Sequence, residues 1–166
     1  MSLNKIPVLL VAFFLAGGAF AQASTSVDIR WIGPYTAEST TSIGDASMLL
    51  GARSQSEGTK SLESTTLISA RIGTRFGVGY VLSGPPTNEL LSLKGVWHFP
   101  SGGMRNPESG RTADKQEWKL NCRVGKDCWA GFIFDKSWEL VPGTWTLEVW
   151  QGATSLVNQT FNVVVP

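Results

Sequence analysis

Few residues of this chain have side chains that could do chemistry. His98 is the only histidine, so any mechanism that needs an imidazole must use it. It alternates out of the Trp97/Phe99 face of an expected strand, and a structural residue on the solvent side is the favoured interpretation. The sequence contains no Gly-x-Ser-x-Gly elbow, no His-Glu-x-x-His pair and no phosphate-binding loop. We therefore expect no catalytic centre, no metal site and no cofactor.

Three acidic residues near the tryptophan-rich C-terminal region could still pair in space. They are Asp135, Glu139 and Glu148. Glycoside hydrolysis uses two carboxyl groups on either side of the scissile bond. Because scattered surface acids are the commoner explanation, a carboxylate-based hydrolase is only the third of three functional hypotheses.

Trp150 provides the sharpest functional hypothesis. It alternates onto the polar face of its strand, beside Thr146 and Glu148, whereas Trp145 points to the apolar face. An exposed tryptophan on a sheet can anchor a protein partner or stack on a sugar ring. The structural alternative is that Trp150 covers the edge of the sheet or packs under polar loops, since single exposed aromatics are ordinary. Trp150, Glu148 and Thr146 are the predicted binding residues.

The first 23 residues have the features of a secretory signal peptide. Lys5 supplies the positive n-region, residues 6–20 the apolar h-region, and Ala21 and Ala23 the small-x-small cleavage site. The apolar run is shorter than the about 20 residues of a membrane span. We expect cleavage near Ala23 and a mature chain, residues 24–166, in the periplasm or outside a bacterial cell, without a membrane anchor.

The expected mature chain has the size of one domain and no net charge. Removing Lys5 leaves 13 basic residues against 13 acidic ones. Such a balance provides no field that would steer the protein to nucleic acid, and no Lys/Arg cluster is present. Nucleic-acid binding is therefore not expected. The sequence leaves the oligomeric state undetermined.

Cys122 and Cys128 are the only cysteines, and they are expected to form a disulfide. An even count at close spacing favours this in an exported chain. Gly125 lies between them, as in a hairpin turn between two strands. Closing so short a loop should stabilise the fold by roughly 2 kcal/mol. A redox centre would have the tighter Cys-x-x-Cys spacing.

The N-terminal half shows weaker strand signals than the C-terminal half. Residues 27–31 alternate apolar and polar side chains and predict a half-buried strand. Residues 36–47 are predicted as a loop, 48–52 as a short strand, and 54–64 as an exposed, mobile turn. The remaining chain predicts strands over residues 66–72, 75–82, 91–100, 117–124, 129–135, 144–151 and 156–165.

Two segments are expected to build the core. In the strand of residues 75–82, the side chains at even positions share one face. Gly77 and Gly79 leave the other face flat, so it could accept an aromatic ring or a close backbone. Residues 138–150 predict a strand end, a tight turn at Pro142 and Gly143, and a second strand whose apolar face begins with Trp145.

The pattern predicts an all-β fold. No helical periodicity follows the signal peptide, and eight or nine short strands alternate with turn signals. Such a pattern is typical of an antiparallel β-sandwich. An immunoglobulin-like sandwich without the inter-sheet disulfide of antibody domains is the first choice, and a small β-barrel is the alternative.

Residues 72–86 resemble the first signature of an uncharacterised bacterial family of exported single-domain proteins, labelled only as a domain of unknown function. Its later signatures match residues 97–100, Asn106-Pro107, Phe134-Asp135, 138–145 and 156–163. The resemblance implies an all-β domain. It implies no established activity and transfers no functional residue. The cysteine pair lies outside the family pattern.

Three functions are compatible with these observations. The first is an exported, non-catalytic β-sandwich module that binds a protein partner in the bacterial envelope. The second is a carbohydrate-binding module that uses exposed aromatic rings, and the third is the carboxylate-based hydrolase. Because sandwich folds host many functions, this order rests on the side chains and not on the fold.

Overall fold

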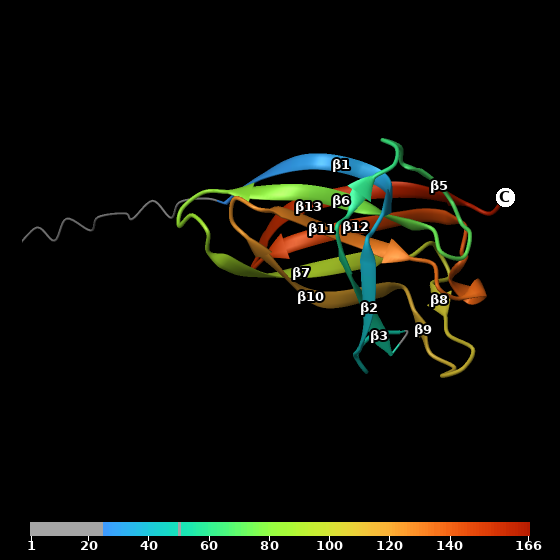
Figure 1. The fold of residues 1–166 in the computed structure, drawn as a ribbon. Coiled ribbons are helices and arrows are strands. Elements are labelled where there is room, and N and C mark those ends of the chain that lie inside the picture. The colour runs from blue at the N-terminus through green and yellow to red at the C-terminus, as the bar shows by residue number, and fades with distance from the viewer. Residues whose placement is uncertain (1–24, 50) are drawn as a thin grey trace, which may run out of the picture.

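The computed structural model describes residues 25–49 and 51–166, so the predicted signal peptide lies outside the described residues. The described chain forms two main sheets that pack face to face (Figure 1). The four-stranded sheet has the order β11 (Asp127–Ile133), β6 (Arg75–Ser83), β1 (Ser26–Thr36) and β4 (Lys60–Ser61). The five-stranded sheet has the order β10 (Lys115–Arg123), β7 (Leu90–His98), β12 (Gly143–Gln151), β13 (Thr154–Val164) and β5 (Leu67–Ser69).

The prediction of a sandwich is confirmed. All pairs of the two main sheets are antiparallel except β13 with β5, which run parallel. The last two predicted strands, residues 144–151 and 156–165, are present as β12 and β13, which pair as a hairpin. Among the described residues, no helix is both long enough and apolar enough to cross a membrane.

The core lies between the inner faces of the two sheets and is rich in aromatic rings. On β6 the predicted inner residues, from Phe76 to Leu82 at alternate positions, are completely buried, and so are Trp145, Leu147 and Val149 on β12. The ring of Phe76 occupies the centre. Four ring centroids lie within 5.9 Å of its own, those of Trp97, Phe134, Trp145 and Phe161. Such pairs stabilise a core beyond the area that they bury.

The structure corrects the prediction for residues 36–64. β2 (Ser39–Gly44) and β3 (Ala52–Glu57) pair as a separate hairpin where a loop and a mobile turn were expected. Figure 1 shows this hairpin running across the strands of the main sheets. The expected strand at residues 48–52 is wrong, because Gly51 N–H closes a turn on the Met48 carbonyl. Backbone pairing and polar contacts, such as Thr40 Oγ1 to Ser56 Oγ at 3.1 Å, define the hairpin.

The cysteine turn differs from the expected hairpin. The disulfide between Cys122 and Cys128 is present. However, Cys122 lies on β10 of the five-stranded sheet and Cys128 on β11 of the four-stranded sheet. The chain changes sheets within the turn. Val124 N–H still donates to the Glu89 carbonyl beside β7 of the five-stranded sheet, whereas Gly125 N–H donates to the Leu82 carbonyl on β6 of the four-stranded sheet. The disulfide therefore links the two sheets.

The segment before β12 also differs from the prediction. Ser137–Glu139 is a 3-10 helix, η1, and not a strand end. Pro142 and Gly143 lead directly into β12 instead of forming a tight turn between two strands. Gly143 still has the positive φ that was expected of it, 127°. Between the predicted strands of residues 91–100 and 117–124, β8 (Met104–Arg105) pairs with β9 (Thr112–Ala113).

Candidate functional site

The three predicted binding residues lie on the outer face of the five-stranded sheet. We call Thr146, Glu148 and Trp150 the outer-face cluster. All three are half-buried. Trp150 Nε1 donates a hydrogen bond to Glu148 Oε2 at 2.9 Å, and Lys94 Nζ lies 6.0 Å from the indole centroid. The Trp150 N–H is therefore already engaged, and its ring alone remains for a ligand.

Glu148 also contacts the only histidine. His98 Nε2 lies 3.3 Å from Glu148 Oε2, and Thr146 faces His98 in the strand register. Thr146 itself turns to β13, where its Oγ1 lies 3.3 Å from Thr160 Oγ1. The structure thus joins Trp150, Glu148 and His98 in one polar group and leaves Thr146 at its side.

The three candidate carboxylates are not brought together. Glu148 lies on the outer face, Asp135 is exposed beside η1, and Glu139 is completely buried. Glu139 Oε2 accepts the backbone N–H groups of Asp135 and Lys136, whereas its Oε1 has no hydrogen-bond partner among the described residues. Burial raises the pKa of Glu139 to about 7, and the two N–H bonds oppose this rise. The Glu139 side chain therefore stabilises the turn before β12. It is not exposed to solvent, where a substrate could reach it.

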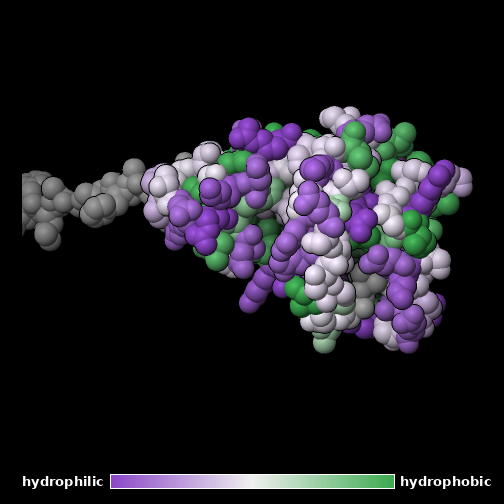
Figure 2. All heavy atoms as spheres, in the orientation of Figure 1, coloured by the Kyte–Doolittle hydropathy of each residue, from purple (hydrophilic) through white to green (hydrophobic). Residues whose placement is uncertain are grey.

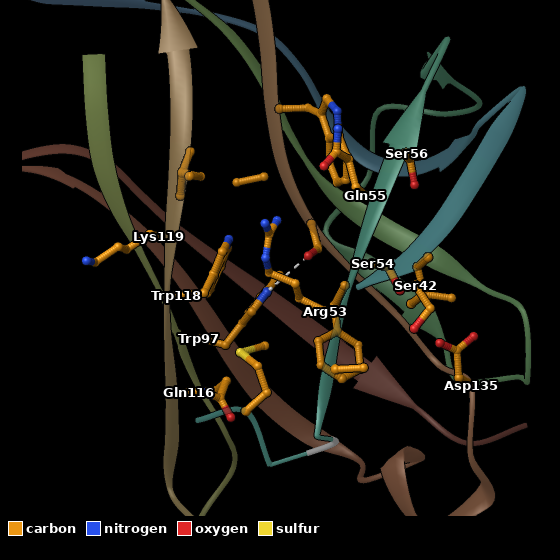
Figure 3. A pocket seen from close by; sticks show the side chains of 18 of the residues that line it. Ser42, Arg53, Ser54, Gln55, Ser56, Trp97, Gln116, Trp118, Lys119 and Asp135 are labelled. Carbon is orange, nitrogen blue, oxygen red and sulfur yellow. Dashed lines mark hydrogen bonds between the residues drawn. The ribbon is translucent and has the colours of Figure 1, made fainter. Parts of the chain in front are cut away.

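A groove that the sequence analysis did not predict lies at one side of the sandwich. We call it the edge groove, a hollow of about 450 Å³ along the edge strands β10 and β11 beside β3. Aromatic and aliphatic side chains line much of it: Trp97, Trp118, Leu120, Trp129 and Phe132. In Figure 3, Trp97 and Trp118 lie on one side, Ser42, Ser54 and Ser56 of the hairpin lie opposite, and Arg53 reaches in between.

Glycines position two of the aromatic rings in this region. Trp118 of β10 faces Gly95 of β7, and a Cβ on Gly95 would lie 2.4 Å from the Trp118 ring. On the outer face of the four-stranded sheet, Trp31 packs over Gly79 in the same way. A Cβ on Gly79 would lie 2.1 Å from Trp31 Nε1. The prediction that the glycine face of β6 accepts an aromatic ring is confirmed. Gly95 carried the same signal, because it too is a glycine within a strand of alternating apolar residues.

The β2–β3 hairpin is held beside the edge groove by its tip. Leu49 is 2% exposed, and its N–H bonds to the Gln116 side chain of β10. Asn106 Nδ2 donates to the Leu49 carbonyl at 3.0 Å, and Arg111 Nη1 donates to the Met48 carbonyl at 3.1 Å. Figure 2 shows mostly hydrophilic and intermediate residues over this hairpin. The apolar walls of the groove are thus combined with a polar hairpin at one side.

Comparison with known proteins identifies the family. Residues 36–163 match the family described as Domain of unknown function (DUF3859). The chain belongs to this family. The resemblance drawn from its signatures is therefore confirmed.

A solved structure agrees with the fold. The chain is similar to an immunoglobulin-like protein from Pseudomonas aeruginosa, with a TM-score of 0.63 and 25% identity. The similarity covers 87% of this chain and 99% of that chain. The immunoglobulin-like prediction is confirmed. No curated protein matches the chain.

The contacts of the family signatures in this DUF3859 chain are structural. In the signature of residues 138–145, the Glu139 carboxylate accepts hydrogen bonds from the backbone N–H groups of Asp135 and Lys136. Trp145 Nε1 donates to the Val141 carbonyl at 2.9 Å. In the Asn106-Pro107 signature, Asn106 Oδ1 accepts the N–H groups of Glu108 and Ser109 while its amide holds the hairpin tip. These residues position the chain beside the edge groove.

Proposed function

We propose that the mature chain is a non-catalytic binding module of the bacterial envelope and that a protein partner occupies the edge groove. The observation that carries this proposal is the groove itself, an open hollow of about 450 Å³ with aromatic walls. Binding sites are typically concave and mostly apolar, with a few convergent polar groups. Gln116, Arg53 and Asp135 supply such groups here.

The composition of the groove favours a protein as the ligand. Tryptophan, tyrosine and arginine carry much of the binding energy at protein interfaces, and Trp118, Trp129, Tyr35 and Arg53 all line the groove. Export is a further part of the proposal. It is supported by the expected signal peptide and by the disulfide, since disulfides persist in oxidising compartments.

Sugar binding is the second candidate, and a specific observation favours it. Trp31 and Trp129 flank Tyr35, with ring centroids 5.4 and 5.5 Å from the tyrosine ring. A second hollow of about 260 Å³ lies between these tryptophans and includes Arg30 and Asp127. Quenching of tryptophan fluorescence by peptidoglycan or glucan fragments, lost in Trp31→Ala, would favour sugar binding over the protein partner.

Site-specific photo-crosslinking in the native bacterium tests the proposal. A photoreactive residue replaces Leu120 in the groove, Glu117 on the opposite face of the same strand, or Trp150 in the outer-face cluster. We expect Leu120 alone to give a discrete protein adduct. Excess unlabelled protein should abolish this adduct, and excess Trp118→Ala should not. An adduct from Trp150 alone would place the site in the outer-face cluster, and equal adducts at all three positions would contradict a specific site.

A further inference from the structure

We infer that the partner contributes an extended segment, flanked by acidic residues, that adds to the free edge of β11 as a new strand of the four-stranded sheet. This inference rests on the proposed function, because it names the conformation and the chemistry of a protein ligand in the same groove.

The first support is the direction of the backbone groups of β11. Phe134, just after the strand, exchanges hydrogen bonds with Gly73 and Thr74 on the β6 side. The Gly131 carbonyl points the other way, since it accepts the indole N–H of Trp97 at 3.4 Å. Backbone groups of alternate residues point to the same side of a strand. Trp129, Gly131 and Ile133 therefore direct their N–H and C=O groups toward the edge groove.

The second support is that this edge is unpaired among the described residues. β11 ends the four-stranded sheet, and β10 across the groove ends the five-stranded one. In the part of the chain that the structure describes, the β2–β3 hairpin beside them pairs with itself and with neither edge. An unpaired edge is a template for another strand. Extended peptides use such edges, with main-chain bonds for affinity and side-chain pockets for specificity.

The third support is the distribution of side chains around this edge. Successive side chains of an added strand would point to opposite faces of the sheet. On the inner side they would meet Trp118 and Phe132, and on the outer side Trp129. Both directions offer aromatic contacts. The segment should therefore carry apolar side chains near its centre.

The charges of the groove indicate the flanks of the segment. Arg53 and Lys136 line it, against the single carboxylate of Asp135. Within residues 25–49 and 51–166, neither cation forms an ion pair. Complementary charges steer association and select partners. We therefore expect acidic residues at the ends of the bound segment, where they would pair with these cations.

Hydrogen exchange with a synthetic peptide tests the inference. The probe is a nine-residue peptide in which valine and threonine alternate and both ends carry glutamate, and its control carries lysine at both ends. We expect the glutamate peptide to slow exchange of the Gly131 and Ile133 amides about tenfold or more. The Ala130 and Phe132 amides, which face β6, should not change. The lysine peptide should bind several-fold more weakly.

A proline variant separates the backbone bond from the side chain. Trp129→Pro and Trp129→Ala both remove the indole, but only proline removes the outward N–H, which an edge strand tolerates. Losing the hydrogen bond of that N–H should weaken peptide binding in Trp129→Pro about fivefold relative to Trp129→Ala. If the proline variant does not fold, the hydrogen-exchange experiment still tests the added strand, because it uses the unmodified protein.

The outcomes separate this inference from the proposed function. If the Leu120 crosslink captures a groove-dependent partner but the peptide leaves the Gly131 and Ile133 amides unprotected, the added strand is refuted and the binding module stands. If the crosslink also fails, both are refuted. Protection of the same amides by rising protein concentration without peptide would overturn the inference in favour of a second copy of this chain.

Discussion

Glu139 makes the stability of this fold depend on pH. Its carboxyl group is completely buried, and burial raises its pKa from the ordinary 4.5 to about 7. Between these pH values the folded state keeps a proton that the unfolded state releases. Stability falls with rising pH wherever the folded state binds more protons. The contribution is therefore fully present below pH 4.5 and is lost as the pH rises through about 7.

The size of this effect follows from the two pKa values. A rise from 4.5 to about 7 corresponds to about 3 kcal/mol of unfolding free energy. Glu139→Gln removes the titration and keeps an oxygen that can accept the N–H groups of Asp135 and Lys136. We expect the two proteins to be similarly stable at pH 5. By pH 8 the wild type should have lost up to about 3 kcal/mol relative to the variant.

Urea unfolding at several pH values between 5 and 8 measures this difference, and equal slopes of free energy against urea concentration would show that the denatured states match. Asp135→Asn is the control, because it removes an exposed carboxyl group on the same turn. The reasoning is refuted if the free-energy difference between wild type and Glu139→Gln does not change with pH. It is also refuted if the wild type gains stability relative to Glu139→Gln as the pH rises.

Three further changes test the packing. Replacing Cys122 and Cys128 by alanine should lower the unfolding free energy in urea by roughly 2 kcal/mol, because the unfolded chain is no longer restricted by the short closed loop. An unchanged midpoint of urea unfolding would contradict this. Gly77→Ala should lower the unfolding free energy by about 1–3 kcal/mol, because its Cβ would lie 2.2 Å from a backbone carbonyl oxygen of β11. Its control, Gly44→Ala, has open space around the added Cβ and should leave the unfolding free energy nearly unchanged. Leu49→Ala should cost about 2–5 kcal/mol in thermal or urea unfolding, and a loss below 1 kcal/mol would show that the hairpin tip is not anchored.

The core could be predicted from the sequence because its strands have a strict period of two. Alternation from Phe76 to Leu82 and from Trp145 to Val149 placed the buried faces correctly, since one face of each strand packs on the other sheet. The β2–β3 hairpin has no such signal. Serines and threonines occupy both of its faces, and among its described residues only Leu49 at the tip reaches the core.

The edge groove depends on relations between strands that a single sequence does not contain. Gly125 marked a turn after Cys122 but not the change of sheet, which follows from long-range bonds to Glu89 and Leu82. That change of sheet makes β10 and β11 the edges of different sheets, with the groove along them. Trp118 lies on the same face of its strand as Leu120, yet its place in a groove wall depends on the position of β3.

Competition of the Leu120 crosslink tests the central claim most directly. Mature protein with a photoreactive residue at position 120 is irradiated in the native envelope with excess unlabelled wild type, Trp118→Ala or Trp150→Ala. We predict one partner adduct that the wild type and Trp150→Ala abolish and Trp118→Ala leaves intact. Equal competition by Trp118→Ala and the wild type would show that the edge groove does not bind the partner.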